Sequence, residues 1–188
     1  LYADPILGRM NRIDQIFREL RCEGRKALMP FITAGDPDLA TTAALAPAIQ
    51  RAGAAICELG VAFSDPIADG PVIQESMTHA LHRGIRPQQI FETIDQVRPN
   101  VTMGLVLMVS FSIVYRMGVK AFVDQARQSG VDGFIFPDLP VEEAPAVHDV
   151  VAEAGLIASF LIAPSTPIDR AERIAAASSG FVYLLSRG

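Results

Sequence analysis

Two carboxylates separated by a short loop are the residues of this chain best placed to do chemistry. They lie in the segment ELGVAFSDPIADGP, which runs from Glu58 to Pro71. Glu58 belongs to an apolar run that predicts a buried strand, and Asp69 lies on the loop behind it. In α/β proteins, active sites lie where parallel strands end. The pair could therefore act as a general acid and base.

Each of these carboxylates also has a purely structural interpretation. Asp65 precedes Pro66 and could be a turn residue, and Asp69 precedes Gly70 and could cap the next helix. Glu58 is harder to explain in this way. An acid in an apolar strand costs stability unless it reaches water or a partner. Glu58 is therefore the stronger functional candidate.

Two histidines offer a weaker signal. His79 and His82 are three residues apart on a predicted helix, a spacing that metal ligands can use. No carboxylate or cysteine completes a set at ligand spacing, so we expect a solvated helix face and no metal site.

Composition limits the classes of protein to consider. The 188 residues are 50% hydrophobic, which suits one packed domain. The net charge is −5 and the basic residues are scattered, which argues against a nucleic-acid partner. No apolar run approaches the length of a membrane span, and residues 1–9 lack the apolar centre of a signal peptide. Cys22 and Cys57 form no CxxC or zinc spacing, which fits a reducing cytoplasm. We expect a cytoplasmic protein without a membrane partner.

Apolar runs alternate with amphipathic stretches along the whole chain. The predicted strands are Ala27–Thr33, Ala55–Val61, Met103–Val109, Gly133–Phe136, Ile157–Ile162 and Phe181–Ser186. The predicted helices are Arg12–Arg21, Ala40–Arg51, Val72–His82, Pro87–Val97, Lys120–Gln128, Glu142–Ala154 and Ile168–Ala177. At least one helix follows each of the first five strands. This order predicts parallel strands joined by right-handed crossovers.

A weak repeat of glycines supports this order. Gly53, Gly130, Gly155 and Gly180 each follow a predicted helix and precede a strand. A barrel and an open doubly wound sheet both fit, but no Gly-rich phosphate loop follows the first strand, which favours the barrel. We expect residues 1–188 to form a single (β/α)8 TIM-barrel domain with about six βα units, an extra N-terminal helix, and the last two units lacking. Either the chain is truncated, or this sequence omits part of the natural one.

Several segments resemble the tryptophan synthase alpha chain family. They are PFITAGDP from Pro30, the Glu58–Pro71 segment, PDLPVEE from Pro137, and YLLSR from Tyr183. The resemblance implies a (β/α)8 barrel that cleaves indole-3-glycerol phosphate to indole and glyceraldehyde 3-phosphate, a carbon–carbon lyase of tryptophan biosynthesis.

The resemblance also assigns roles to residues. Glu58 matches the catalytic glutamate of the family and Asp69 its catalytic aspartate. Phe31 and Tyr183 match residues that line the indole pocket, although plain core packing is the commoner role of strand aromatics. No cofactor is implied for this chain.

A beta chain that carries pyridoxal phosphate is the implied partner, in an alpha2-beta2 heterotetramer. The resemblance places Ser64, Asp65, Pro66 and Asp138 at that interface. The chain departs from the family pattern at Ala62 and at Ser110–Ile113, which we read as a loop. The family binds the substrate phosphate with residues that follow the sixth strand, beyond the end of this sequence.

Two other functions remain open from the sequence. One is a truncated, non-catalytic barrel that binds a beta chain. The other is a barrel isomerase that acts on a phosphorylated sugar-like substrate with a single Glu as base.

Overall fold

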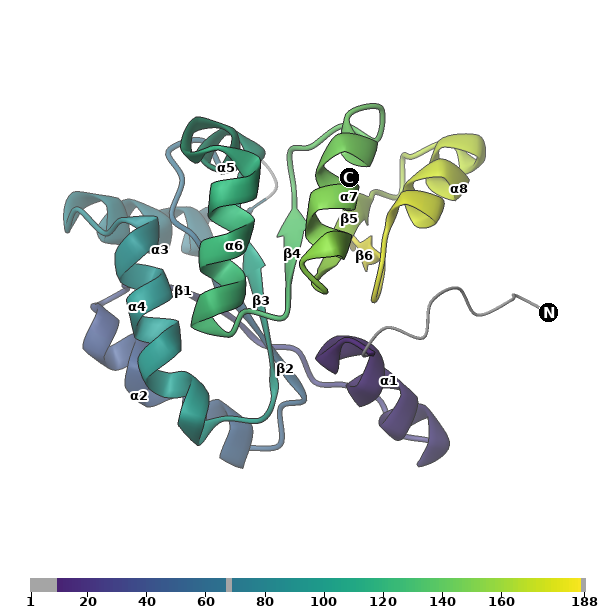
Figure 1. Ribbon diagram of the computed structural model, residues 1–188. Coiled ribbons are helices and arrows are strands. Elements are labelled where there is room, and N and C mark those ends of the chain that lie inside the picture. Colours follow the sequence, from purple (N-terminus) through teal and green to yellow (C-terminus); the bar gives the residue numbers. More distant parts are fainter. Residues whose placement is uncertain (1–9, 67–68, 187–188) are drawn as a thin grey trace.

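Figure 1 shows a computed structural model of the chain, which describes residues 10–66 and 69–186. Within these residues, six parallel strands form one sheet whose spatial order follows the chain. The strands are β1 (Phe31–Thr33), β2 (Ile56–Gly60), β3 (Gly104–Met108), β4 (Gly133–Phe136), β5 (Ile157–Ile162) and β6 (Tyr183–Leu184). The helices are α1 (Arg12–Cys22), α2 (Leu39–Arg51), α3 (Pro71–His82), α4 (Pro87–Val97), α5 (Phe111–Met117), α6 (Val119–Ser129), α7 (Ala144–Glu153) and α8 (Ile168–Ala177), with a 3-10 turn at Arg98–Asn100.

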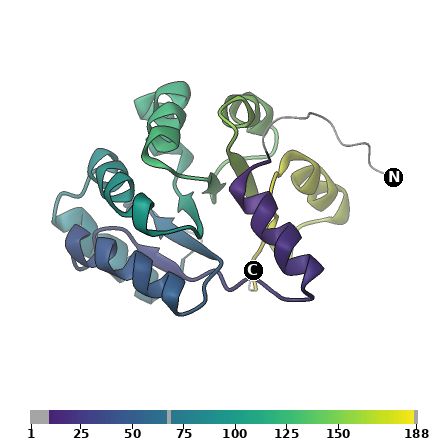
Figure 2. The same ribbon diagram turned by 60° about the horizontal axis from the view of Figure 1, so that its bottom comes forward.

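The sheet is curved, and most helices cover its outer side. Figure 2 shows α2, α4, α6, α7 and α8 in an arc around the strands, with α1 on the opposite side. This arrangement is an α/β half barrel, as the alternation of elements predicted.

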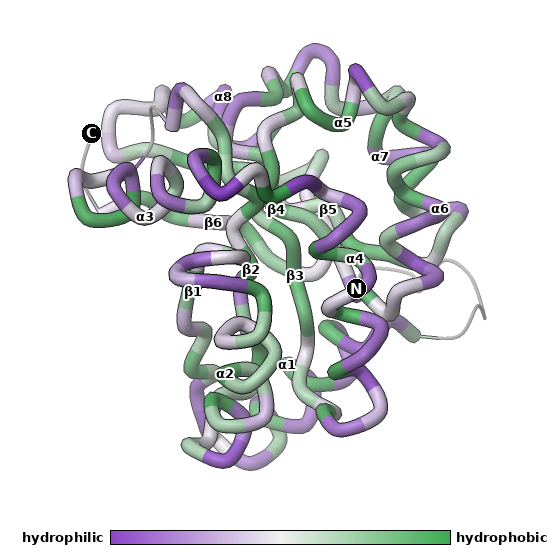
Figure 3. Tube along the Cα trace, turned by 90° about the vertical axis from the view of Figure 1, so that its left-hand side faces the viewer, coloured by the Kyte–Doolittle hydropathy of each residue, from purple (hydrophilic) through white to green (hydrophobic). Residues whose placement is uncertain are grey.

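Successive side chains of each strand point to opposite faces of the sheet. One set packs against the outer helices, as Leu59, Leu107 and Phe134 do. The other set, which includes Ile56, Val106 and Ile135, forms a smaller inner cluster. Both faces are therefore largely apolar, and β3 is green over most of its length in Figure 3.

Most predicted elements are present, and their ends differ for local reasons. The glycines Gly53, Gly130, Gly155 and Gly180 all have positive φ, as a turn from helix to strand requires. The strand predicted from Ala27 begins only at Phe31, because Pro30 has no N–H to give to the ladder. The last strand is likewise shorter than predicted, over Tyr183–Leu184.

The prediction of a loop at Ser110–Ile113 was wrong, because α5 begins there. Ser110 is its N-cap and its side chain accepts a hydrogen bond from the Ser112 N–H. Val114 is fully buried, and Gly118 ends the helix with φ +84°. Seven residues are too few to establish a helical period in a sequence.

Helix α1 closes the inner face at the end where the strands begin. Its N-cap Asn11 donates hydrogen bonds to the carbonyls of Asp132 (3.0 Å) and Gly155 (2.7 Å). Ile13 is fully buried in the inner cluster. A Cβ on Gly104 would collide with Ile13, so glycine lets the helix approach the sheet.

Asp132 is the centre of a buried polar network at this same end. Its carboxylate accepts hydrogen bonds from Arg98 (3.1 Å), from Arg12 (3.2 Å) and from the Leu105 N–H (2.9 Å). Burial raises the pKa of Asp132, and the Leu105 bond and the two guanidinium charges oppose that rise. The network joins α1, the 3-10 turn, β3 and the start of β4.

We predict that Asp132→Ala lowers the free energy of unfolding by about 3 to 5 kcal/mol, because it leaves Arg98 buried without its counter-charge. The control is Asp124→Ala, which removes the exposed Lys120–Asp124 pair and should cost at most about 0.5 kcal/mol. Urea unfolding of both variants measures the difference. Equal losses would show that the network contributes no more than a surface pair.

Candidate active site

Glu58 is the middle residue of β2, the second strand of the sheet. It alternates with Ile56 and Gly60 along β2, so its side chain points to the inner side. The residue is 4% exposed, and no hydrogen bond to its carboxyl occurs among the described residues. Burial raises its pKa from 4.5 to about 7. A carboxyl with this pKa can both give and take a proton near neutral pH.

Two aromatic side chains share the inner face with Glu58. Phe31 is paired with Glu58 across β1 and β2, and a Cβ on Gly60 would collide with its ring. Tyr183 comes from β6, at the other edge of the sheet. Burial raises the pKa of its hydroxyl, and the negative charges of Glu58 and Asp69 raise it further. Glu58 and Asp69 are thus each close enough to Tyr183 for their charges to act on its hydroxyl.

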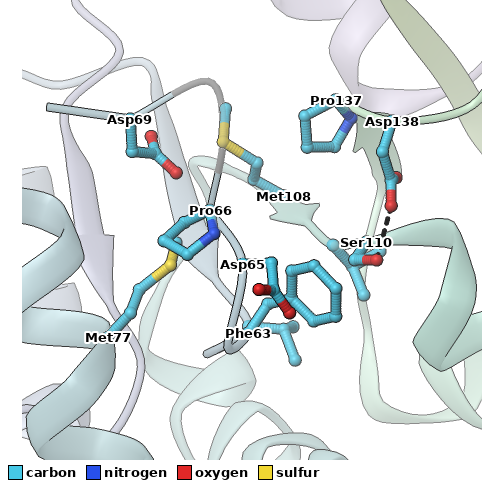
Figure 4. A pocket seen from close by; sticks show the side chains of 11 residues that line it. Phe63, Asp65, Pro66, Asp69, Met77, Met108, Ser110, Pro137 and Asp138 are labelled. Carbon is cyan, nitrogen blue, oxygen red and sulfur yellow. Dashed lines mark hydrogen bonds between the residues drawn. The ribbon is translucent and has the colours of Figure 1, made fainter.

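Asp69 lies in a hollow at the C-terminal end of the strands. Figure 4 shows its carboxylate beside Pro66 and Met108, with Asp65 farther down the same loop. The hollow also includes Pro137 on the β4 side. Burial raises the pKa of Asp69. The helix cap expected as its alternative role is absent, because Gly70 is the N-cap of α3 and no side-chain cap bond is formed there among the described residues.

The residues predicted for a partner interface lie around this hollow. Ser64 and Asp65 are exposed, and the Ser64 hydroxyl donates to the Asp65 carboxylate at 2.7 Å. Asp138 lies across from them, in the loop after β4. It accepts hydrogen bonds from the Ser110 hydroxyl (2.5 Å) and from the Phe111 N–H (2.7 Å), so it also fixes the start of α5. The sequence did not indicate this second role.

The two histidines, His79 and His82, lie on an exposed face of α3, as the sequence predicted. His79 is about half exposed and its Nδ1 lies 3.6 Å from the Asp36 carboxylate. No group of three or more possible metal ligands occurs among the described residues. No helix in the described residues is both long enough and apolar enough to span a membrane.

The geometry supports acid–base chemistry on an aromatic substrate. Glu58 is a buried carboxyl with a pKa of about 7, and Asp69 is a second carboxyl whose charge, like that of Glu58, acts on Tyr183. The aromatic rings of Phe31 and Tyr183 could flank a flat apolar ligand between these two groups.

Comparisons with known proteins identify the family. A family model described as tryptophan synthase alpha chain matches residues 17–188. The tryptophan synthase alpha chain of Microcystis aeruginosa is 44% identical over 177 residues, which are 94% of this chain and 67% of that protein. That of Rhodopirellula baltica is 47% identical over 180 residues, 94% of this chain and 65% of that protein. The chain belongs to the tryptophan synthase alpha chain family.

Solved structures of the family have the same fold. Tryptophan synthase subunit alpha from Legionella pneumophila matches with a TM-score of 0.90 and 37% identity, covering 95% of this chain and 68% of that one. The alpha chain fold also matches in a tryptophan synthase complex from Pyrococcus furiosus, with a TM-score of 0.81 and 41% identity over 84% of this chain and 65% of that one. This chain spans about two thirds of the length of the curated relatives it matches.

The pKa of Glu58 predicts a specific dependence of stability on pH. Between pH 4.5 and about 7 the unfolded chain loses the proton of Glu58 and the folded chain keeps it. The contribution of Glu58 to stability is therefore fully present below pH 4.5 and is lost as pH rises to about 7, a change on the order of 3 kcal/mol. Glu58→Gln should remove this pH dependence.

Urea unfolding of the parent chain and of Glu58→Gln between pH 4 and pH 8 measures the effect. The difference between their free energies of unfolding should change by a few kcal/mol across this range and then level off. Parallel curves would mean that Glu58 ionises normally in the folded state.

Proposed function

We propose that this chain carries the acid–base pair of an indole-3-glycerol phosphate lyase. The reaction is the retro-aldol cleavage to indole and glyceraldehyde 3-phosphate, one step in the synthesis of tryptophan. The observation that carries the proposal is the Glu58 carboxyl, buried on the inner face of β2 with a pKa of about 7, whose charge acts on Tyr183 as that of Asp69 does. Family membership supports the same reaction.

Glu58 is proposed to handle both protons of the reaction. Protonation of indole C3 turns the ring into an electron acceptor. Removal of the proton from the hydroxyl on the adjacent side-chain carbon then breaks the bond between that carbon and C3. The electron pair of the broken bond returns to the ring, and the hydroxyl oxygen becomes the aldehyde oxygen. One proton is gained and one is lost, so a single carboxyl near its pKa can serve for both.

Asp69 is proposed to stabilise the positive charge that develops on the ring. Its carboxylate would accept a hydrogen bond from the indole N–H, and this bond strengthens as the ring becomes cationic. The partly buried position of Asp69 supports the role, because a charge acts more strongly where water is excluded. Phe31 and Tyr183 are proposed to pack against the ring.

Glu58→Gln tests the proposal in the protein expressed from its complete gene. We expect the rate of indole release to fall at least about a hundredfold, the usual scale of acid–base catalysis, because the amide cannot exchange the protons. The fold should remain intact, since glutamine has almost the same volume. Indole release at a rate near that of the parent protein would refute the assignment.

We also propose that a beta chain with pyridoxal phosphate binds the C-terminal face of the strands, in a cytoplasmic alpha2-beta2 heterotetramer. Ser64 and Asp65 are exposed on that face, and Pro66 and Asp138 lie behind them around the hollow. Function in barrels is concentrated in the loops of this face. Tryptophan synthase complexes exist among the structural relatives.

A matching beta chain should raise the lyase rate of the protein from the complete gene, because binding orders the loops around the site. Asp65→Ala should weaken the complex, whereas Asp149→Ala, an exposed acid on α7, should not. Titration of the beta chain with light scattering and an indole assay measures both effects. The absence of a complex at micromolar concentration, or equal effects of the two substitutions, would contradict the proposed interface.

A further inference from the structure

The backbone beside Asp69 is held by a side chain to which no role has yet been assigned. Gln74 lies in the first turns of α3, and its Nε2 donates a hydrogen bond of 2.8 Å to the Asp69 carbonyl. The same atom lies 3.5 Å from the Pro66 carbonyl. The Asp69 N–H also donates to the Pro66 carbonyl, at 3.2 Å. The Gln74 side chain therefore joins the backbone carbonyls of Pro66 and Asp69, on either side of the segment that leads to the hollow.

The hydrogen bond from Gln74 to the Asp69 carbonyl fixes the entry into α3, where no N-cap side chain does so. Gly70 is the N-cap of α3 and has no side chain with which to fix the entry into the helix. Without the Gln74 bonds, the Asp69 carbonyl would be fixed only through the backbone. The position of the Asp69 carboxylate then depends on how firmly Gln74 and α3 are held.

Helix α3 is itself anchored to the loop that follows β1. The Ser76 hydroxyl donates a hydrogen bond of 2.5 Å to one oxygen of the Asp36 carboxylate. The Nδ1 atom of His79 lies 3.6 Å from the other oxygen of that carboxylate. Met77 and Ala80 are buried beneath the helix and pack near Phe31. Polar contacts on one flank and apolar contacts below thus fix α3 against β1 and β2, which carry Phe31 and Glu58.

We infer that Gln74 is a positioning residue for Asp69, and that the Ser76–Asp36 hydrogen bond anchors the helix from which it acts. The inference rests on the proposed function, because it gives Asp69 a catalytic role. Gln74 touches no reacting atom in this scheme. It holds the backbone of Asp69 so that the carboxylate meets the ring N–H in the geometry that the transition state needs.

Gln74→Met tests the inference in the protein from the complete gene, because methionine keeps the length of the side chain and loses the donor. Val72→Met is the matched control, since Val72 is 77% exposed on the same turn of the helix. We expect kcat of Gln74→Met to fall about tenfold with KM within twofold, because misplacement weakens the transition state more than substrate binding. Ser76→Ala should cause a smaller fall of the same kind, and the control should change neither constant.

A double-mutant cycle separates positioning from a general structural effect. In an Asp69→Asn background, Gln74→Met should cause no further fall in kcat, because the carboxylate that it positions is gone. An unchanged kcat for Gln74→Met alone would overturn the inference. So would a tenfold fall that persists in the Asp69→Asn background.

Hydrogen exchange of the Asp69 amide provides a readout that does not depend on activity. This amide is bonded to the Pro66 carbonyl, so its exchange should be faster in Gln74→Met and unchanged in Val72→Met. If the parent protein has no lyase activity, the proposed function fails and the exchange rates still decide whether Gln74 holds Asp69. Equal exchange in the parent and in Gln74→Met would overturn the inference in either case.

Discussion

Desolvation of one carboxyl is the constraint on which the rest of this molecule depends. Glu58 is in the second strand of a parallel sheet whose two faces are apolar, and no hydrogen bond to its carboxyl occurs among the described residues. Such a group is tolerated because it can remain protonated, so its pKa rises to about 7. The same desolvation that costs stability at neutral pH gives the carboxyl the pKa that proton transfer needs. The rest of the structure has to offset the loss in the free energy of unfolding that the buried Glu58 carboxyl causes.

Hydrogen bonds and packing at the opposite end of the strands contribute stability that offsets this loss. The Asp132 network and the packing of α1 against the start of the sheet lie where the strands begin. Asp69, the Ser64–Pro66 loop and Asp138 lie where the strands end. The separation follows from parallel strands, which bring all their C-terminal loops to one face. Asp132 at the beginning of the strands accepts three hydrogen bonds, whereas at the end the Asp69 carboxylate accepts none among the described contacts.

The sequence predicted those features of the fold and the site that depend on neighbouring residues. It did not predict those that depend on residues far apart in the chain. Local signals were sufficient for the alternating elements and for the positive-φ glycines, because a helix period and a turn are fixed by neighbouring residues. Glu58 was also predictable, as an acid in an apolar strand. Helix α5 was missed because its cap is completed by Asp138, from the next strand. The Ser76–Asp36 contact was missed for the same reason, since its partners are 40 residues apart.

Family resemblance assigned roles that local patterns could not, but it did not reveal how the residues are supported. Asp69 and Asp138 both follow strands, yet their environments differ. Asp138 has two hydrogen-bond donors, which fix it to α5 and leave less of its carboxylate for a substrate. Asp69 is bonded only through its backbone among the described contacts, so its carboxylate is free to accept a donor in the hollow.

The proposed division of labour between the two carboxyls follows from these environments. Burial raises the pKa of both Glu58 and Asp69, and each negative charge raises the pKa of Tyr183. An aromatic ligand that excludes water would favour the protonated form of Glu58 still more. Its N–H, as a donor to Asp69, would favour the ionised form of that carboxyl instead. Binding would therefore move the two pKa values apart, which makes Glu58 the acid and Asp69 the fixed negative charge before any bond is broken.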